Sequence, residues 1–431
     1  MISKSLLSWE TEVEERGFLR DSTLLFVANM SANFLLFLFH FSVARLLPPS
    51  EYGELVSLLA FIWIFSVPFR TVQTVTAEAI AGLRRDQQLA RIWGTWRTNL
   101  LTVVPIGGIC LALFTLGKRS ISDFLAINSE NAVVILGISV AISFFLPVNR
   151  GILQGIQRFR DLGLNILTEA LFRLSFGVLL VFFGWGLDGA LLSYGLGYVV
   201  AFLFAFVSLR PLLRDGGEGS RKSPDFIALI NGYSLHVLVI NACLMTMVNL
   251  DVLLVNHYFS SVESGTYAAA SMFGKITLLT SAAVGGVMFP KIAALSTFSQ
   301  KRIQLLKKGA LFAGLSASAL AIGFVLLPSL SISILLGPSY TAAGAYVGMF
   351  GLAMVVFSQI NILVSYHLAM RSVKITLPVI AAVFIEGVLL SVFHSSLEQV
   401  LLALIGVMVG LLACLFLYTW WGEVKGHVER A

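Results

Sequence analysis

Four cationic side chains lie inside long apolar stretches of this sequence: Arg45, Arg70, Arg173 and Lys275. Hydrocarbon solvates ions poorly, so each of them is a candidate for function. Arg70 lies near the middle of its stretch, two residues after Pro68, which would open the hydrogen-bond ladder of a helix. Gln73 and Thr74 follow at helical spacing, and Glu78 lies near the edge of the same face. A guanidinium in such a place is suited to bind two phosphate oxygens at once.

Each of these cations also has a structural interpretation. Arg70 either binds an anion or pairs with a carboxylate on another helix and locks the two helices together. Lys275 either supplies a second positive charge or extends its side chain toward the outer interface. For Arg45, at the end of its stretch, extension toward the interface is the favoured interpretation. Arg173 follows Glu169 by four residues, a spacing that predicts an ion pair within one helix and leaves a ligand role as the alternative.

Two acidic residues, Asp251 and Glu386, also lie within apolar stretches. A carboxyl group in the membrane can take up and release a proton, so either is a candidate for coupling ion movement to a conformational change. For Asp251 the favoured interpretation is structural, in which it neutralises Lys275 or an arginine of the first half. Glu386 has no obvious partner in its own helix and is the better coupling candidate, while Glu78 and Glu169 are candidates for charge pairs.

Uncharged polar residues form a stripe on the first apolar stretch. Asn29, Asn33 and His40 return to one face of a helix, and that face would suit sugar hydroxyls if it bordered a cleft. Asn249 is a similar polar residue within an apolar stretch of the second half of the chain. Polar residues also join neighbouring helices within a membrane, so a structural role stays open for all four.

The elements that must position these residues are apolar stretches long enough to cross a bilayer. With 57% hydrophobic and 12% charged residues, the composition excludes a soluble globular domain. We predict an all-α polytopic membrane protein with about 12 transmembrane helices. The predicted spans are 22–47, 53–80, 99–117, 131–149, 163–183, 188–209, 227–256, 265–290, 309–328, 342–366, 375–393 and 399–421.

The charges outside these spans predict an orientation. Of the 29 lysines and arginines, 23 fall in alternate gaps, and the opposite gaps keep only Lys118 and Arg119. Short loops rich in cations stay in the cytoplasm, so both termini are predicted to be cytoplasmic. The net charge of +6 is spread over these gaps, which argues for contact with anionic lipid and against nucleic-acid binding. The three cysteines show no metal-ligand or disulfide spacing, and we expect no metal and no cofactor.

A polar segment at 210–226 divides the predicted spans into two sets of six. We therefore predict two six-helix lobes, 22–209 and 227–421, with a cytoplasmic segment at 1–21 and a cytoplasmic tail at 422–431. Shifting the chain by 212 residues aligns the first four spans of both lobes without gaps and places Glu51-Tyr52-Gly53 on Glu263-Ser264-Gly265. An even number of spans in each lobe predicts pseudo-two-fold symmetry about the membrane normal.

Several short motifs resemble one family in their order and spacing. They are Arg20-Asp21-Ser22, the run from Ala44 to Gly53, Asn149-Arg150-Gly151 to Phe159, Asn249 to Asn256, Gly265-Thr266-Tyr267 to Phe289-Pro290, and Leu336-Gly337-Pro338-Ser339-Tyr340. The chain resembles the polysaccharide transporter branch of the multidrug/oligosaccharidyl-lipid/polysaccharide exporter superfamily, which includes O-antigen flippases of the Wzx type. One departure is Pro48, where the family pattern usually has a glycine.

The resemblance implies a flippase of a bacterial or archaeal cytoplasmic membrane. It would move a polyprenyl-pyrophosphate-linked oligosaccharide from the inner to the outer leaflet during synthesis of a cell-surface polysaccharide, with a polymerase or ligase as a further partner. An antiporter for drugs or small solutes would share the fold but would need an acidic cavity for cations. A membrane-embedded polysaccharide polymerase or ligase is the enzymatic alternative. The gap at 118–130 is too short for the long catalytic loop that such enzymes have, so we do not expect an enzyme.

Overall fold

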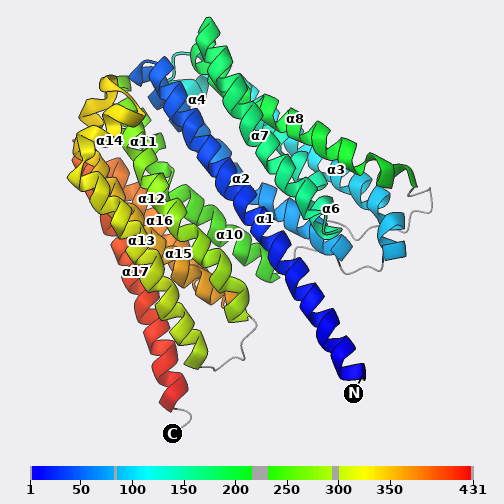
Figure 1. Cartoon of the computed structure of the whole chain (residues 1–431). Helices are drawn as coiled ribbons and strands as arrows, with labels where there is room; N and C mark the ends of the chain where they lie inside the picture. Colours follow the sequence, from blue (N-terminus) through cyan, green and yellow to red (C-terminus); the bar gives the residue numbers. More distant parts are fainter. Residues whose placement is uncertain (1, 82–84, 216–231, 294–299, 429–431) are drawn as a thin grey trace. The chain divides into compact units, whose positions relative to one another are not determined.

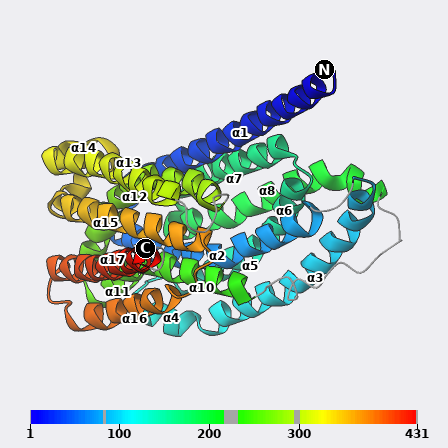
Figure 2. The same ribbon diagram turned by 90° about the horizontal axis from the view of Figure 1, so that it is seen from below.

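The computed structural model describes residues 2–81, 85–215, 232–293 and 300–428, and within them it describes side chains except at 2–22, 85–91, 213–215, most of 279–293, 329 and 422–428. The described residues are 91% helical and contain no strand. Figures 1 and 2 show the helices from two directions. The helices of the first half are α1 (Ile2–Leu46), α2 (Pro49–Ala81), α3 (Arg85–Leu116), α4 (Lys118–Phe124), α5 (Glu130–Ser143), α6 (Leu146–Gly155), α7 (Phe159–Leu180), the π-helical turn η1 (Val181–Trp185) and α8 (Gly186–Asp215).

The second half is also helical throughout its described residues. Its elements are α10 (Gly232–Met247), α11 (Leu250–Tyr258), α12 (Ser261–Ala293), α13 (Gln300–Leu326), α14 (Pro328–Leu335), the 3₁₀ turn η2 (Pro338–Ala343), α15 (Gly344–Ala369), α16 (Thr376–Val392) and α17 (Leu397–Val428). The expected linker 210–226 lies outside the described residues after Asp215. The predicted tail 422–431 begins inside α17, whose backbone stays helical to Val428.

Within the described residues, every predicted span lies on one or two helical elements. Eight helices in the described part of the chain are long and apolar enough to cross a membrane, and the bent pair α10–α11 makes a ninth. One of the eight, Phe159–Leu212, contains two predicted spans that meet at Gly184, where φ is +88°. A positive φ favours glycine, which allows the chain to turn between α7 and α8. With α12 and the shorter α16, the prediction of an all-α polytopic protein with about twelve spanning helices is confirmed.

The helices form two compact units. Unit 1 comprises Met1–Leu46, Pro68–Ile121 and Ser129–Ile230, and unit 2 comprises Leu47–Val67, Ser122–Asn128 and Asn231–Ala431. The first part of α2 therefore packs within unit 2, and the part from Pro68 onward packs within unit 1. The lobe boundaries predicted from the sequence stay a prediction.

Small residues allow the helices of unit 1 to pack closely. α7 packs along α8 and α1 (Figure 1). α8 also packs against α5. Gly177 of α7 faces the ring of Phe39 on α1, and a side chain at this position would collide with that ring. Such glycine contacts are a common way for helices to associate in lipid, where apolar burial itself gives little driving force. Tight packing of these helices fixes the positions of the polar residues between them.

In unit 2, the glycines of the two Glu-x-Gly motifs, Gly53 and Gly265, lie in close contact. A Cβ atom on Gly53 of α2 would lie 2.7 Å from the backbone nitrogen of Gly265 on α12, and a Cβ atom on Gly265 would collide with the backbone carbonyl of Pro49. Tyr52, next to Gly53, is fully buried and packs edge-on against Tyr340. The Glu-x-Gly motif at the start of each helix thus provides the close contact between α2 and α12.

We expect Gly265→Ala to destabilise the protein by about 1–3 kcal/mol, because the added methyl group overpacks a contact between two backbones. Gly410→Ala on α17 is the matched control, since a Cβ atom there meets no other atom within 4 Å. Thermal unfolding in detergent should show a lower midpoint for Gly265→Ala only. Equal midpoints for the two variants would contradict the close contact.

Candidate functional site

The second part of α2, from Arg70 onward, has an exposed polar face. Arg70, Thr74 and Glu78 follow one another by four residues and are all exposed, whereas Val72 and Val75 are buried. Residues four apart lie on the same side of a helix, so the three form a polar stripe on unit 1. The side chain of Arg70 has no hydrogen-bond or ion-pair partner among the residues that the structure describes. An unpaired arginine in mid-span is costly in lipid, so this face favours contact with water or an anion.

The helix is interrupted just before Arg70. Pro68 lacks an N–H group, so it leaves the carbonyl one turn earlier without its helical hydrogen bond. The hydroxyl of Ser66 donates to the carbonyl oxygen of Trp63 at 2.6 Å, and the hydroxyl of Thr74 donates to that of Arg70 at 3.0 Å. Side-chain hydroxyls thus supply additional hydrogen bonds around the proline, as membrane helices require.

The buried side of α2 is held by α6 and α3. Gly151 of α6 lies so close to α2 that a Cβ atom would be 2.5 Å from the Cβ atom of Thr76. Gln73 donates to the side chain of Gln154 on α6 at 2.9 Å, and Asn99 of α3 donates to Thr76 at 2.9 Å. Gln73, predicted to bind substrate, is therefore also a structural link. These contacts fix the rotation of α2 and with it the direction of its exposed face.

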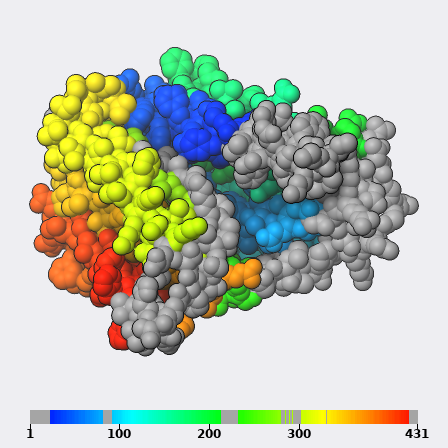
Figure 3. Space-filling view, turned by 60° about the horizontal axis from the view of Figure 1, so that its bottom comes forward, coloured from blue at the N-terminus to red at the C-terminus, as the bar shows by residue number. Residues whose placement is uncertain are grey.

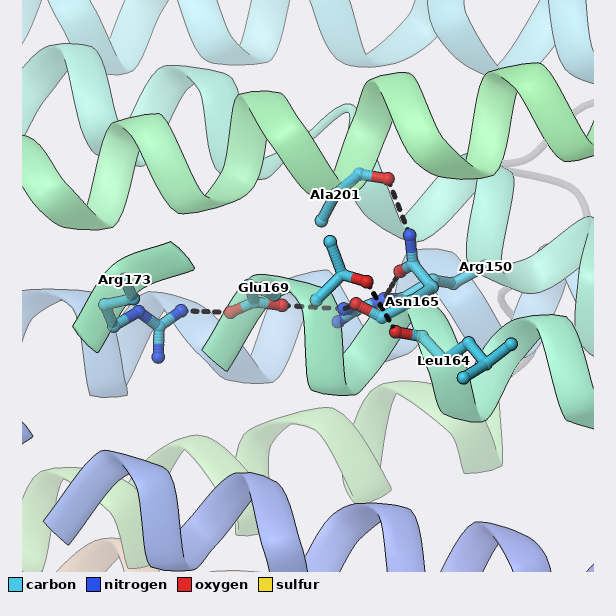
Figure 4. Close-up of polar contacts among 7 residues, drawn as sticks. Arg150, Leu164, Asn165, Glu169, Arg173 and Ala201 are labelled. Atoms are coloured by element: carbon cyan, nitrogen blue, oxygen red, sulfur yellow. Dashed lines mark hydrogen bonds and ion pairs between the residues drawn. The ribbon is translucent and has the colours of Figure 1, made fainter. Parts of the chain in front are cut away.

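A second charged cluster, shown in Figure 4, lies in the interior of unit 1. Glu169 of α7 pairs with Arg173 one turn later, as the spacing predicted, and also with Arg150 of α6 at 2.7 Å. Arg150 donates to Asn165 at 2.7 Å, and Asn165 in turn donates to the carbonyl of Ala201 on α8 at 2.6 Å. One carboxylate between two guanidinium groups leaves a net positive charge.

Aromatic rings complete the surroundings of Arg173. Its guanidinium carbon lies 4.3 Å from the ring centre of Tyr194 and 5.4 Å from that of Tyr198, both on α8. These distances fit cation–π contacts, which stabilise a positive charge in a dry site. Arg173 is thus held by an anion and two rings, in keeping with the expected ion pair, and its ligand role stays a prediction. Arg150 lies outside the predicted spans, and its contact with Glu169 could not be predicted because the two residues are on different helices.

The polar stripe on α1 is not uniform in exposure. Asn29 is exposed and donates its amide to the carbonyl of Leu25 in its own helix at 2.7 Å, whereas Asn33 is half-buried. His40 is buried and lies edge-on to the neighbouring Phe39. Arg45 is exposed in the last turn of the helix. A sugar-binding role for Asn29, Asn33 and His40 stays a prediction, as does a substrate contact for Arg45.

In unit 2, four of the predicted residues come together at the break between α10 and α11, where the helix axis bends by 40°. Asn249 lies in this break and accepts a hydrogen bond from Lys275 of α12 at 3.0 Å. Asp251 accepts one from the hydroxyl of Tyr267 at 2.9 Å. Glu386 of α16 is fully buried and interacts electrostatically with Asp251, as Lys275 also does.

The carboxylates of this cluster are incompletely paired. Both oxygens of Glu386 and one oxygen of Asp251 are buried without a hydrogen-bond partner among the described residues. The charges of Lys275 and Asp251 interact, but no direct ion pair joins them in this part of the chain. Buried polar atoms without partners are rare in proteins and require an explanation, such as a proton or cation bound during function.

The comparisons with known proteins place the chain in a family. A family model described as polysaccharide biosynthesis protein matches residues 42–345. The chain belongs to this family. An uncharacterized membrane protein of Methanocaldococcus jannaschii is 22% identical to this chain over 326 residues, or 73% of this chain and 75% of the relative.

Solved structures show that this family member has the fold of the MOP superfamily. A multidrug resistance MATE family transporter in an inward-facing conformation matches with a TM-score of 0.72 and 13% identity, covering 91% of this chain and 94% of the other. The lipid II flippase MurJ in an inward closed conformation matches with a TM-score of 0.72 and 12% identity, covering 92% and 87%. A MOP superfamily transporter from Pyrococcus furiosus matches at 0.62 and 15%, covering 94% of both chains. The resemblance to the polysaccharide branch of this superfamily is thereby confirmed.

We expect Glu169→Gln to lower the free energy of unfolding by about 3–5 kcal/mol, because it leaves Arg150 and Arg173 buried without a counter-charge. Asp161→Asn is the matched control. It removes the partner of Arg158 in a more exposed pair, which contributes at most about 1 kcal/mol. Thermal unfolding in detergent separates the two variants. If both unfold at the same temperature, the cluster does not hold unit 1 together.

Proposed function

We propose that this protein is a flippase for a polyprenyl-pyrophosphate-linked oligosaccharide, acting in the synthesis of a cell-surface polysaccharide. It would act as a transporter rather than an enzyme and move the lipid from the inner to the outer leaflet by alternating access of its two lobes. Membership of the polysaccharide biosynthesis family and the MOP fold support this role. The single observation on which it depends most is Arg70 in the middle of α2, which is exposed and has no partner among the described residues.

The proposed substrate gives a role to an arginine within the membrane. A pyrophosphate head must pass about 30 Å of hydrocarbon, where its charge and its lost hydrogen bonds are expensive. The guanidinium of Arg70 can bind two phosphate oxygens, and Thr74 on the same face adds a hydroxyl. Lys275 of unit 2 is the second proposed contact for phosphate, with Asn29, Asn33, His40, Gln73 and Asn249 as polar partners for the sugars and Arg45 and Arg173 as further cations.

The membrane potential and the buried acids of unit 2 are the proposed sources of energy. Two negative charges leaving an inside-negative cell gain about 2.3 kcal/mol each per 100 mV, so the potential alone can assist export. The unpaired oxygens of Glu386 and Asp251 support a second contribution, in which a proton or cation binds there and alters the packing of α11 and α16. Glu78 on the polar face of α2 is a further candidate for ion coupling or charge pairing.

The same proposal includes the membrane in which the protein lies, its orientation and its partners. The substrate and the distribution of positive charge support a location in the cytoplasmic membrane of a bacterium or archaeon, with both termini in the cytoplasm. A polysaccharide polymerase or ligase would receive the flipped lipid. A drug antiporter would share the fold of the MATE transporter, but the exposed cation on α2 would repel a cationic drug, which disfavours that alternative.

Arg70→Ala should reduce surface glycan about tenfold or more in cells that lack the native copy, because the phosphate loses its charged partner. Arg70→Lys should restore part of the activity, since lysine supplies the charge without the two-pronged geometry. Arg97→Ala, which removes another exposed arginine, is the control for expression and insertion. Wild-type glycan in correctly inserted Arg70→Ala protein would refute the proposed role.

Glu386→Gln should abolish the dependence of flipping on a pH gradient, because an amide cannot take up a proton. The measurement is transbilayer movement of the lipid in proteoliposomes with and without the gradient. Glu263→Gln is the control, since Glu263 is an exposed carboxylate at the start of α12. If Glu386→Gln flips normally and keeps its response to the gradient, Glu386 is not the coupling site.

A further inference from the structure

Unit 2 contains a groove of about 680 Å³ that the proposed transport does not use. Gln359, Leu363 and Tyr366 of α15 line its base, and residues of α13 and α17 line its sides. α13 and α17 each pack against α15, which lies between them in Figure 2. The yellow-green surface of α13 and the red surface of α17 appear on the same face of the molecule in the space-filling view (Figure 3).

The groove lies at one end of these helices. Its lining comes from the start of α13 and from the later parts of α15 and α17, which run in the opposite direction. On α17 the lining extends from Val409 to Trp420, which is about 16 Å along a helix at 1.5 Å per residue. A bilayer has a hydrocarbon core of about 30 Å, so the groove covers the depth of one leaflet.

The chemistry of the lining changes along this length. Most lining residues are apolar, including Leu412, Ala413 and Phe416 of α17. The hydroxyl of Thr419 is already engaged with His367 and with the carbonyl of Leu415. Lys307 lines the groove from α13 and has no ion pair within the described part of the chain. Trp420 lines the groove as well and is 64% exposed, as expected of an aromatic residue at a membrane interface.

We propose that this groove binds one acyl chain of an anionic phospholipid, with the lipid phosphate against Lys307. The apolar length matches the hydrocarbon of a single leaflet, whereas the polyprenyl chain of the proposed substrate is longer than one leaflet. Lys301 and Lys308 are exposed on the same end of α13 and add positive charge near the phosphate. Basic pockets between membrane helices on the cytoplasmic side are known sites for anionic head groups, and this end of α13 is the predicted cytoplasmic end. The site does not depend on the proposed transport function.

Native mass spectrometry of the full-length, delipidated protein tests the proposal. Palmitoyl-oleoyl phosphatidylglycerol is the probe, and phosphatidylcholine with the same chains is the neutral comparison. We expect one phosphatidylglycerol per chain and little phosphatidylcholine. Lys307→Ala should weaken binding about fivefold, the usual contribution of one lysine near anionic lipid, whereas Lys308→Ala should have a smaller effect because Lys308 does not line the groove.

A second pair of variants tests the apolar part of the groove. Ala413→Phe fills the groove and should prevent retention of the lipid. Leu417→Phe adds an aromatic ring to an exposed position on the same helix outside the groove and should leave retention unchanged. Equal retention in the two variants, or equal binding of phosphatidylcholine, would overturn the proposal. Binding of undecaprenyl phosphate at this groove in preference to phosphatidylglycerol would also overturn it and assign the groove to the substrate chain.

Discussion

The cost of an unsatisfied polar group in hydrocarbon is the constraint on which the arrangement of this protein depends. It explains why the backbone of the described residues is almost entirely helical. It also explains why most of their interior polar side chains are bonded, either to a carbonyl of their own helix or to a neighbouring helix. In unit 1, Glu169 is shared by two arginines, and Asn165 connects that cluster to α8. Side chains that escape this pairing are therefore informative. Among the described residues, Arg70 is exposed without a partner and Glu386 is buried without one.

The two unpaired groups differ in what they can do. An exposed guanidinium can accept a large anion without any rearrangement of its own helix, because Gln73 and Thr76 already fix α2 from behind. A buried carboxyl group can accept only something as small as a proton or a bare cation. In the proposed transport, we therefore assign anion binding mainly to Arg70 of unit 1 and ion coupling to Glu386 of unit 2.

Close backbone packing sets a second constraint. Gly53 and Gly265 leave no space for a side chain, so the contact between α2 and α12 holds only with glycine at both positions. The same helix α2 passes from unit 2 to unit 1 at Pro68, where one backbone hydrogen bond is missing. The packing of α2 therefore depends on two positions. Gly53 of the Glu-x-Gly motif allows its close contact with α12, and Pro68 marks where the helix begins to pack within unit 1.

The amino-acid sequence determined the membrane class, the positions of the spanning helices and the family, because apolar length and charge periodicity are local properties of the chain. It also predicted the pair of Glu169 and Arg173, which lie one helical turn apart. It did not reveal that Arg150 shares Glu169, that Lys275 bonds to Asn249, or that a groove separates α13 from α17. These features join residues that are far apart in the chain. Only the packing of the helices decides which polar side chain meets a partner and which is left to bind something else.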